Sequence, residues 1–566
     1  MFVRIKDTPN SPRKSVQIVQ SVRKGKNVSQ KIVRHVGIAM DDYELEKLKL
    51  LAESIKIKLE AEHQQLLFSP EEMVSLQNKA EKTKHNFTDE DYQVDIRNLK
   101  EEKRIINGIQ DVYGSLFVEL GFNKVIKNPV RNKSSVEILK EVVLARIANP
   151  LSKLATVNYL EEDFGVTINL DRIYQTMDKL DNLAIEKINE TAFSNTLKLF
   201  NNKLDVIFFD CTTIYFESFD EDELRQNGFS KDLKFNQPQV LLALMVTTEG
   251  LPIGYKLFEG SKYEGHTLIP ALKELKKKYK LNKVVFVADS GLMNENNIAE
   301  IESDQTEDPI DYIIGARIKS VSGELKSQIF DLSNYKEVEN NETGYKIGTF
   351  EYKNRKLIVN YSPKRAKKDA LDRQKSIERL EKKLKKQKNP KEYLSKFGAS
   401  RYLKLEGSAN IVLNKEKIEA ESKWDGLHGV ITNSKTIDDM EIINQYCNLW
   451  QVENAFRVTK HDLKVRPVYH WKPSRVKAHI AISFIAYTMV KHLEYRVKLQ
   501  YVKMSPEKIR QTLVNVQTSI MYDKKKNIRY ALPSNSSIEA KKIYKLLNIS
   551  IKSTPYILEK CSALQK

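Results

Sequence analysis

Cysteine is scarce in this chain. Only Cys211, Cys447 and Cys561 occur among 566 residues, and no two of them form a Cys-x-x-Cys pair. Thiols so far apart exclude a disulfide framework and a thiolate zinc site, and they are typical of a reducing cytoplasm. Long apolar runs are missing as well, because the longest, 481–490, is too short to cross a bilayer. The N-terminus also has no apolar stretch of signal-peptide length. We therefore expect a cytoplasmic protein with no membrane contact.

Acidic residues are outnumbered by basic ones. The chain has 75 Asp and Glu against 94 Lys and Arg, which gives a net charge of +19. Such an excess raises the electrostatic potential over much of the surface and favours a polyanionic partner, because phosphate contacts release counterions. A generally lysine-rich proteome is the alternative explanation. Charge alone favours nucleic acid and leaves that alternative open.

The hydrophobic pattern changes along the chain and predicts several domains. Residues 14–36 alternate around a Lys24-Gly-Lys-Asn turn, as a hairpin does. Residues 204–318 contain strand-like runs that later alternate with helices, which is typical of a mixed sheet in a ribonuclease-H-like core. The expected domains are 1–100, a hairpin and helix region; 101–200, a helical region; 201–320 and 426–500, the two parts of the core; 321–425, an insertion domain; and 501–566, a helical tail. The predicted class is α/β, with a mainly β insertion that interrupts the core and a largely helical N-terminal region.

Two helical stretches within 101–200 are separated by a short break. They cover 152–163 and 171–180, and Phe164-Gly165-Val166 lies between them. This pattern resembles a helix-turn-helix, whose second helix enters a major groove. Ordinary packing of two helices around a glycine turn is the alternative.

Acidic residues follow two of the strand-like runs. Asp210 ends the run that begins at 204, and Asp289 ends the run that begins at 284. A third acid, Glu453, lies in a helical stretch that starts after Asp438. Carboxylates at strand ends and on a helix, far apart in sequence, are how a polynucleotidyl-transfer fold gathers oxygen ligands for a divalent metal. The predicted catalytic and metal-binding residues are therefore Asp210, Asp289 and Glu453.

Aromatic and cationic side chains surround Glu453 if the stretch is one regular helix. At 3.6 residues per turn, one face would carry Tyr446, Trp450, Glu453, Arg457, Lys460 and Lys464. An ordinary amphipathic helix would instead separate apolar from charged residues. A simple ion pair between Glu453 and Arg457 is the alternative interpretation.

These residues resemble the DDE transposases of bacterial insertion sequences, in the insertion-sequence-four superfamily. The third acid of that family lies in a Tyr, Arg, Glu, Lys signature, which Tyr446, Glu453 and Lys460 match. Leu449 stands where the family has its arginine, and Arg457 on the same predicted face is a candidate substitute. Further stretches, among them 250–260 and 466–470, resemble the long-insertion subgroup, and the resemblance covers 1–490.

The resemblance implies metal-dependent DNA cleavage and strand transfer. Asp210, Asp289 and Glu453 would hold two Mg²⁺ ions, with Mn²⁺ as a substitute. The implied DNA-binding residues are Tyr446, Arg457, Lys460, Lys464, Arg466 and His470. For His470, contact with the cleaved end and simple packing stay open.

The implied partners are double-stranded DNA and a second copy of the chain. The DNA would comprise the terminal inverted repeats, bound in part by 101–200, and the target. The protein would act as a homodimer on DNA in the nucleoid. A catalytically inactive DNA-binding protein derived from a transposase is the alternative function.

A stretch from Gly260 to Thr267 is one residue from a phosphate-binding P-loop. His266 stands where a lysine would reach the β and γ phosphates. A neutral imidazole at pH 7 cannot replace that lysine. We therefore expect no nucleotide cofactor.

Overall fold

The structure is a computed structural model, and it divides the chain into two compact units. It describes residues 2–7, 14–24, 27–39, 42–61, 88–201, 204–217, 220–228, 236–263, 266–267, 269–272, 285–289, 295–303, 310–339, 342–386, 401–406, 410–466, 468–501 and 504–560. The N-terminal unit comprises Met1–Leu99, Asp523–Ile528 and Lys560–Lys566, and the main unit comprises Lys100–Tyr522 and Arg529–Glu559.

The N-terminal unit is built from an antiparallel sheet and a helix. Its main elements are β1 (Phe2–Asp7), β2 (Lys14–Lys24), β3 (Asn27–Ala39), α1 (Asp42–Ala61) and α3 (Asp89–Tyr92). β2 pairs with both β1 and β3. Val16 and Ile18 on β2 are buried, and Leu45 and Ala52 of α1 join them in one small core. The hairpin predicted over 14–36 is confirmed, and β1 adds a strand that the sequence analysis did not predict.

A mixed sheet organises the main unit. In the described part of the chain its strand order is β10-β11-β12-β15-β9-β8-β5-β6-β7. β6 and β7 continue from β5 in antiparallel fashion, whereas β8 and β9 run parallel to β5 on its other side. These strands are β5 (Val206–Tyr215), β6 (Gln239–Val246), β7 (Pro252–Glu259), β8 (Val285–Ala288), β9 (Asp311–Gly315) and β15 (Leu427–Thr432). The predicted α/β class is confirmed by this mixed sheet and its helices.

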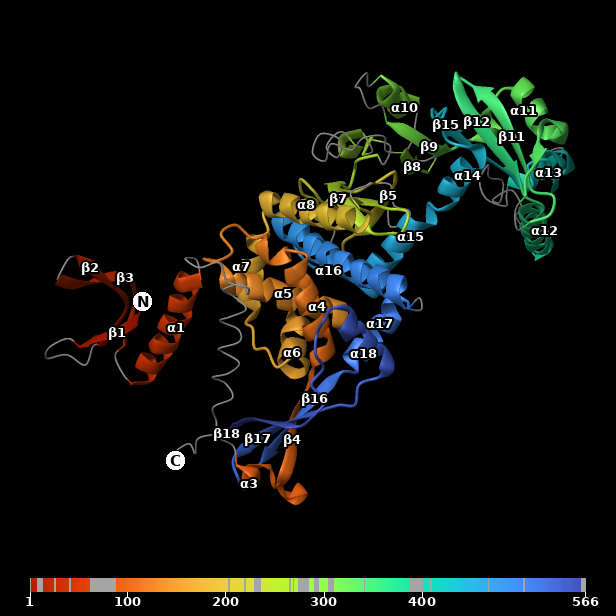
Figure 1. Cartoon of the computed structure of the whole chain (residues 1–566). Coiled ribbons are helices and arrows are strands. Elements are labelled where there is room, and N and C mark those ends of the chain that lie inside the picture. Colours follow the sequence, from red (N-terminus) through yellow and green to blue (C-terminus); the bar gives the residue numbers. More distant parts are fainter. Residues whose placement is uncertain are drawn as a thin grey trace. The chain divides into compact units, whose positions relative to one another are not determined.

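Helices from two distant parts of the sequence pack together in the main unit. They are α4 (Asn107–Glu119), α5 (Lys133–Ala148), α6 (Lys153–Asp163), α7 (Leu170–Asp178), α8 (Asn182–Leu199), α14 (Asp439–Cys447), α15 (Trp450–Arg457) and α16 (Pro473–Gln500). α16 lies against α5, α7 and α8, and both α8 and α16 lie against β7 (Figure 1). α6 and α7 confirm the two predicted helical stretches, and Gly165 between them has a φ of +67°. None of the helices in the described ranges combines the length and apolar composition that a bilayer crossing needs.

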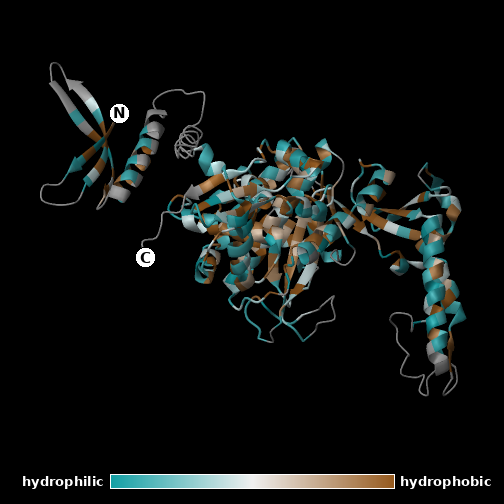
Figure 2. Cartoon of the chain, turned by 90° about the horizontal axis from the view of Figure 1, so that it is seen from below, coloured by the Kyte–Doolittle hydropathy of each residue, from teal (hydrophilic) through white to brown (hydrophobic). Residues whose placement is uncertain are grey.

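Two hydrophobic cores lie on opposite faces of the sheet. Side chains alternate between the faces along each strand. Phe208 and Val287 accordingly belong to the larger core, which also contains residues of α4, α5, α15 and α16. Phe209 and Ala288 belong to the smaller core. Figure 2 shows hydrophobic residues gathered in the interior of the part that holds this sheet. Burial on both faces explains why the strands of this region have nearly continuous apolar sequences.

The predicted insertion contains helices as well as strands. Its elements are α11 (Gly323–Phe330), β10 (Lys336–Glu337), β11 (Lys346–Tyr352), β12 (Arg355–Tyr361), α12 (Pro363–Lys386), β13 (Leu403–Glu406), β14 (Asn410–Leu413) and α13 (Lys415–Ser422). β12 pairs with β15 and so extends the main sheet. The expectation of a mainly β insertion is therefore corrected to a mixed segment. The charged run forms the 24-residue helix α12 because Leu380 and Ile377 pack on the small β13–β14 sheet.

The C-terminal segment also differs from its prediction as a helical tail. It contains α17 (Pro506–Val514), β16 (Gln517–Asp523), β17 (Ile528–Pro533), α18 (Ile538–Leu546) and β18 (Tyr556–Lys560). These strands form a sheet in the order β18-β17-β16-β4, where β4 covers Leu99–Ile106. The sequence analysis missed the local β16–β17 pair, and β4 joins it from a distant part of the chain.

Candidate active site

Asp210 and Asp289 are neighbours across two parallel strands. The last registered pair of β5 and β8 is Phe209 with Ala288. The residue that follows Phe209 is Asp210, and the residue that follows Ala288 is Asp289. Neighbouring strands lie about 4.8 Å apart. If the alternation of side chains continues, both carboxylates point toward the larger core, as Phe208 does. Asp210 is half-buried and Asp289 is exposed. The register therefore brings together two of the three predicted metal ligands.

Asp210 is held by the next residue of its own strand, and that residue contacts the P-loop-like stretch. Its Oδ1 accepts a hydrogen bond from the backbone N–H of Cys211, at 2.7 Å. Cys211 Sγ lies 3.1 Å from Oγ1 of Thr267, which is fully buried. Residues 264–265 of the stretch lie outside the described residues. Thr267 thus packs in the core next to the residue that follows the first acid.

Glu453 does not complete a cluster with the two aspartates. It is exposed in the first turn of α15, which buries Val452, Ala455 and Phe456. α15 lies against β5 and β6, and its buried residues belong to the larger core that both aspartates face. Within the described ranges, however, no three His, Cys, Asp or Glu side chains lie close enough to hold one metal ion. The fold therefore places the helix of Glu453 on the face of the larger core, but the three acids form no cluster in the described ranges.

Tyr446 reaches the second aspartate. Its hydroxyl donates to Asp289 Oδ1 at 3.5 Å, and its ring centroid lies 5.1 Å from that of His428 on β15. Burial, and then the negative charge of Asp289, raises the pKa of Tyr446. Burial, and then the charge of Arg365, lowers the pKa of His428 to about 4. The tyrosine predicted to bind DNA thus contacts a predicted metal ligand.

His428 and Arg365 were missed by the sequence analysis. His428 lies on the strand where the core resumes after the insertion, and this position was the only available signal. Arg365 lies in the charged run of α12, where nothing in the sequence distinguishes it from its neighbours.

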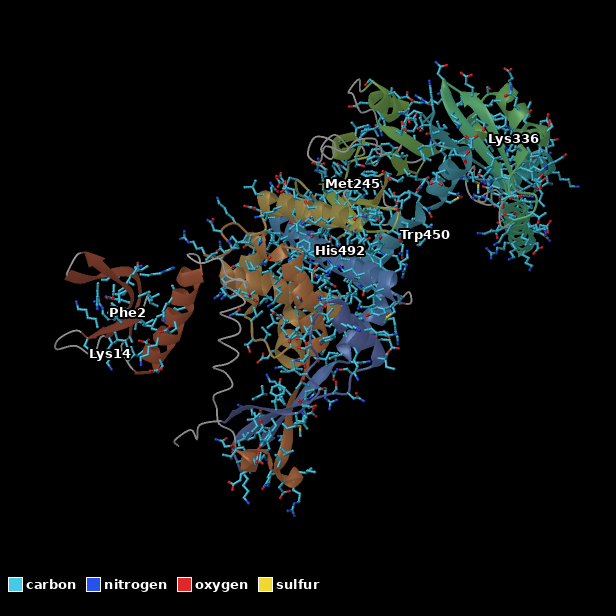
Figure 3. All side chains as sticks on the ribbon, in the orientation of Figure 1. Phe2, Lys14, Met245, Lys336, Trp450 and His492 are labelled. Atoms are coloured by element: carbon cyan, nitrogen blue, oxygen red, sulfur yellow. The ribbon has the colours of Figure 1, made fainter. Side chains whose placement is uncertain are left out.

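The stretch that carries Glu453 is not one regular helix. α14 ends at Cys447 and α15 begins at Trp450, a half-exposed residue labelled in Figure 3. The backbone N–H of Leu449 bonds to the carbonyl of Tyr446, three residues earlier rather than four. After Arg457, residues Val458–Asp462 form a π-helix. The prediction of a single face from 446 to 464 was therefore wrong, because both irregularities rotate the residues beyond them.

The predicted cations lie on different elements, because Arg457 is on α15 with Glu453, whereas Lys460 and Lys464 lie beyond the end of that helix. Arg457 is exposed and bonds to Asn454 Oδ1 at 2.8 Å, so no pair with Glu453 is needed to explain its position. Lys460 lies on the π-helix and is half-buried. Lys464 follows it with a φ of +42°, a backbone conformation that is uncommon outside glycine.

Leu449 is half-buried and packs against the larger core. The position of the missing signature arginine is thus partly an interior position in this chain. Arg457 and Leu449 lie on either side of Glu453, at the two ends of α15.

Arg466 and His470 lie on the segment that leads into α16. The guanidinium of Arg466 lies 5.3 Å from the ring centroid of Tyr215, at the end of β5. His470 is buried, and its ring packs against Tyr174 and His479. Burial, followed by nearby cations, lowers the pKa of His470 to about 3. The packing interpretation of His470 thus has direct contacts in its favour.

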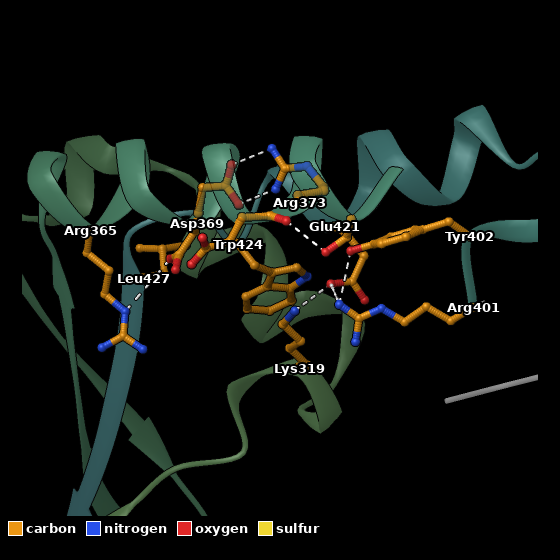
Figure 4. A pocket seen from close by; sticks show the side chains of 12 residues that line it. Lys319, Arg365, Asp369, Arg373, Arg401, Tyr402, Glu421, Trp424 and Leu427 are labelled. Carbon is orange, nitrogen blue, oxygen red and sulfur yellow. Dashed lines mark hydrogen bonds and ion pairs between the residues drawn. The ribbon is translucent and has the colours of Figure 1, made fainter. Parts of the chain in front are cut away.

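A cavity lies in the insertion. Its volume is 490 Å³, and its charged side chains largely pair with one another, as Arg373 does with Asp425 and Lys319 with Glu421 (Figure 4). Trp424 lines this cavity and packs its ring on Phe330, with centroids 4.6 Å apart. Trp424 thus packs within the insertion.

Acid should destabilise this fold through its buried histidines. Burial lowers the pKa of His428 to about 4, and of His470 and His492 to about 3, from an ordinary value of 6.5. In the unfolded chain these rings bind protons below pH 6.5, whereas in the folded chain they stay neutral until the pH approaches about 4 for His428 and about 3 for the other two. Stability is therefore lost as the pH falls from 6.5 toward 4. We expect Tm from thermal scans to drop between pH 7 and pH 5, and less steeply in His428→Gln.

Carboxylates whose pKa is lowered by their partners lose their contribution to stability mainly below this pH range. They therefore do not produce the same fall in Tm. A flat Tm between pH 7 and pH 5 would contradict the assignment of these rings as neutral.

Comparison with family models identifies the family of this chain. A family model described as the transposase DDE domain matches residues 201–489, just over half of the chain. Among solved structures, the cryo-EM structure of the piggyBac transposase synaptic complex with hairpin DNA has a TM-score of 0.36 and 9% sequence identity, over 72% of this chain and 77% of that chain. The Mos1 transposase paired-end complex with left transposon end has a TM-score of 0.13 and 12% identity, over 29% of this chain and 56% of that chain. No curated protein matches the chain.

Proposed function

Because the chain belongs to the family of transposases with a DDE domain, we propose that it cleaves DNA at the ends of an insertion sequence and transfers the freed strands to a target. One observation carries this proposal. Asp210 and Asp289 follow the last registered pair of two parallel strands, and α15 with Glu453 lies on the face that they share. Acids on two neighbouring strands and on a covering helix suit chemistry on phosphodiesters.

The core is proposed to be ribonuclease-H-like. The order β7-β6-β5-β8-β9, with β5 to β7 antiparallel and β8 and β9 parallel to β5, supports this assignment. In this arrangement the first acid lies on the first strand, the second acid follows the fourth, and the third acid comes after the insertion. The extension of the sheet by β10, β11 and β12 is then the contribution of the inserted segment.

Asp210, Asp289 and Glu453 would hold the divalent metal. Their donor atoms are carboxylate oxygens, which Mg²⁺ prefers, and Mn²⁺ would substitute for it. Two such ions would polarise the scissile phosphate and activate the attacking oxygen. The protein's part is to fix Asp210 through Cys211 and to hold Tyr446 against Asp289.

The DNA contacts are proposed at the cationic residues beyond Glu453. Tyr446, Glu453 and Lys460 keep the spacing of the insertion-sequence-four signature, whereas Leu449 departs from it. Arg457, Lys460, Lys464 and Arg466 supply positive charge in the segment after the third acid. Two copies of the chain would bring together the two inverted repeats, with α6 and α7 as candidates for reading them.

The second candidate function is a DNA-binding protein that has lost catalysis. The exposed position of Glu453, outside any described cluster of metal ligands, favours this candidate. The two functions share their DNA partner and differ only in strand cleavage.

Excision of a small element tests the proposal. The DNA on both sides of the gene supplies candidate ends, so a plasmid that carries a marker between these flanks is the substrate. With Mg²⁺ we expect the marker fragment to be released by the purified protein, and with EDTA we expect none. Binding of the flanks without cutting in Mg²⁺ or Mn²⁺ would establish the inactive DNA-binding protein. Absence of binding would reject both functions.

A further inference from the structure

A cavity lined by basic side chains lies between the α6–α7 pair and the segment that follows Glu453. Its volume is 410 Å³. Its basic lining residues are Arg146, Lys153, Lys464, Arg466, His470 and His479. No carboxylate is among the described residues that line it. Arg475, which stacks on the lining residue Tyr174, is paired with Asp178 and is therefore already neutralised. The described lining is therefore predominantly cationic.

Two of these cations are buried. Arg146 is 4% exposed and Lys153 is 5% exposed. Arg146 Nη1 donates to the carbonyls of Leu463 at 2.9 Å and Lys464 at 3.3 Å, but its buried Nε has no hydrogen-bond partner. A buried guanidinium normally satisfies its donors, because an unpaired charged donor loses its hydration without compensation. The free Nε is therefore a vacant donor position in the wall of the cavity.

The beginning of α6 supplies a second feature that attracts anions. Ser152 is the N-cap and accepts from Ala155, and Ser152, Lys153 and Leu154 all line the cavity. The first backbone N–H groups of a helix lack partners within the helix, and the helix dipole makes this end positive. Helix N-termini bind phosphate groups for these reasons. The eleven-residue α6 thus adds its positive end to the buried cations.

The titration behaviour of the group agrees with a strong positive potential. Burial, and then the charge of Arg146, lowers the pKa of the Lys153 ammonium well below its ordinary value. The pKa of His470 is lowered by burial and then by Lys153 and Arg146. A bound anion would reverse these shifts by compensating the buried charges.

The surroundings favour a nucleic-acid strand over a small free anion. Tyr469 lines the cavity and is 63% exposed, and the nearby Trp471 is 64% exposed. Exposed aromatic rings beside a cationic groove are typical of sites where bases stack. Arg466 also links the cavity to Tyr215, which is five residues beyond Asp210 on β5 and therefore about 16 Å along the strand. A DNA strand that is cleaved at the two aspartates would therefore need only a few further nucleotides to reach the cavity.

We propose that this cavity binds a backbone phosphate of the DNA, at a position a few nucleotides from the scissile bond. The inference rests on the proposed function, because DNA is its ligand. The phosphate accepts from Arg146 Nε, from the Lys153 ammonium and from the first N–H groups of α6. Lys464 and Arg466 lie at the entrance, through which the DNA strand reaches the cavity.

Removal of one cation should change the salt dependence of DNA binding. We expect Lys153→Met to weaken binding of a fluorescein-labelled duplex about tenfold near 0.1 M salt and to reduce the log-log salt slope by about 0.9, the loss of one phosphate contact. Methionine preserves the apolar stem of the side chain, so the fold is expected to persist and Tm to stay level or rise. Lys464→Met, at an exposed position in the same cavity, should reduce the slope similarly.

Lys415→Met provides the matched control. Lys415 is also the first residue of a helix after a capping side chain, but it is exposed on α13 and does not line the cavity. We expect its slope to equal that of the wild type. If Lys153→Met and Lys464→Met also keep the wild-type slope while the wild type binds DNA, the cavity proposal is wrong and the proposed function stands.

Two further outcomes separate the sources of phosphate. If inorganic phosphate raises Tm of the wild type but not of Lys153→Met, and the DNA slopes stay equal, the cavity binds free phosphate and the proposal is overturned. If the wild type binds no duplex at any salt concentration, the proposed function and the cavity proposal fail together.

Discussion

Asp210→Asn and Asp289→Asn are each expected to abolish Mg²⁺-dependent excision while DNA binding persists. Asparagine has the size of aspartate, so neither change opens a void in the core, but it removes one negative charge from the pair that follows the last registered residues of β5 and β8. Changes in the groups that merely support metal ligands already cost about 10-fold to 100-fold in activity. Loss of a ligand should therefore exceed about 100-fold. The measurement is the yield of released fragment over time, with duplex binding followed in parallel.

Asp311→Asn is the matched control for this pair. Asp311 begins β9, the next parallel strand, and is half-buried like Asp210, but it lies at the opposite end of the sheet. Its amide variant should excise the marker at the wild-type rate. Normal excision by Asp210→Asn or Asp289→Asn would remove that residue from the catalytic site, whereas equal loss in Asp311→Asn would point to a general effect of charge on folding.

The two aspartates could be predicted because their signal is local. Each follows a short apolar run, and a run buried on both faces is recognised as a strand without knowledge of its neighbours. The structure brings them together through the parallel register of β5 and β8, in which Phe209 and Ala288 are the last pair before both acids. Only Asp289 follows the end of its strand, because β5 continues beyond Asp210 to Tyr215.

The surroundings of the third acid could not be predicted in the same way. A helical wheel assumes a constant 3.6 residues per turn. Neither proline nor glycine marks the break at Asn448 and Leu449 or the π-helix at Val458–Asp462. Tertiary contacts lie next to the second irregularity, where Arg146 donates to the carbonyls of Leu463 and Lys464 just after the π-helix. Those contacts join residues more than 300 positions apart, so no local pattern reports them.

Long-range pairing also explains the other omissions. β4 pairs in a sheet with strands that lie more than 400 residues later, and its own sequence, Leu-Lys-Glu-Glu-Lys-Arg-Ile-Ile, is mostly exposed. Arg365 and His428 approach Tyr446 and Asp289 only because β12 pairs with β15 after the insertion. The sequence identifies an acid from its immediate context, but it does not identify the residues that the fold brings beside that acid.

Glu453→Gln should abolish excision without weakening DNA binding, if Glu453 is the third metal ligand. The side chain is exposed and the change preserves its length. The free energy of unfolding is therefore expected to change by less than about 0.5 kcal/mol, the usual range for a surface substitution. The carboxylate is the only feature removed. Arg457 bonds to Asn454 in this fold, so loss of an ion pair with Arg457 would not account for a large effect. Excision and duplex binding are measured as for the aspartates.

Glu441→Gln separates a metal ligand from an ordinary helix-capping charge. Glu441 is, like Glu453, an exposed acid in the first turn of its helix, and its neighbour in space is Gln445. Both substitutions remove the same favourable interaction with a helix N-terminus, which contributes about 0.3–1 kcal/mol. If only Glu453→Gln loses excision, the carboxylate must reach the two aspartates in the working complex, because in the fold of the free chain it stands apart from them. If both variants excise normally, Glu453 is a surface residue and the proposed active site keeps only its two aspartates.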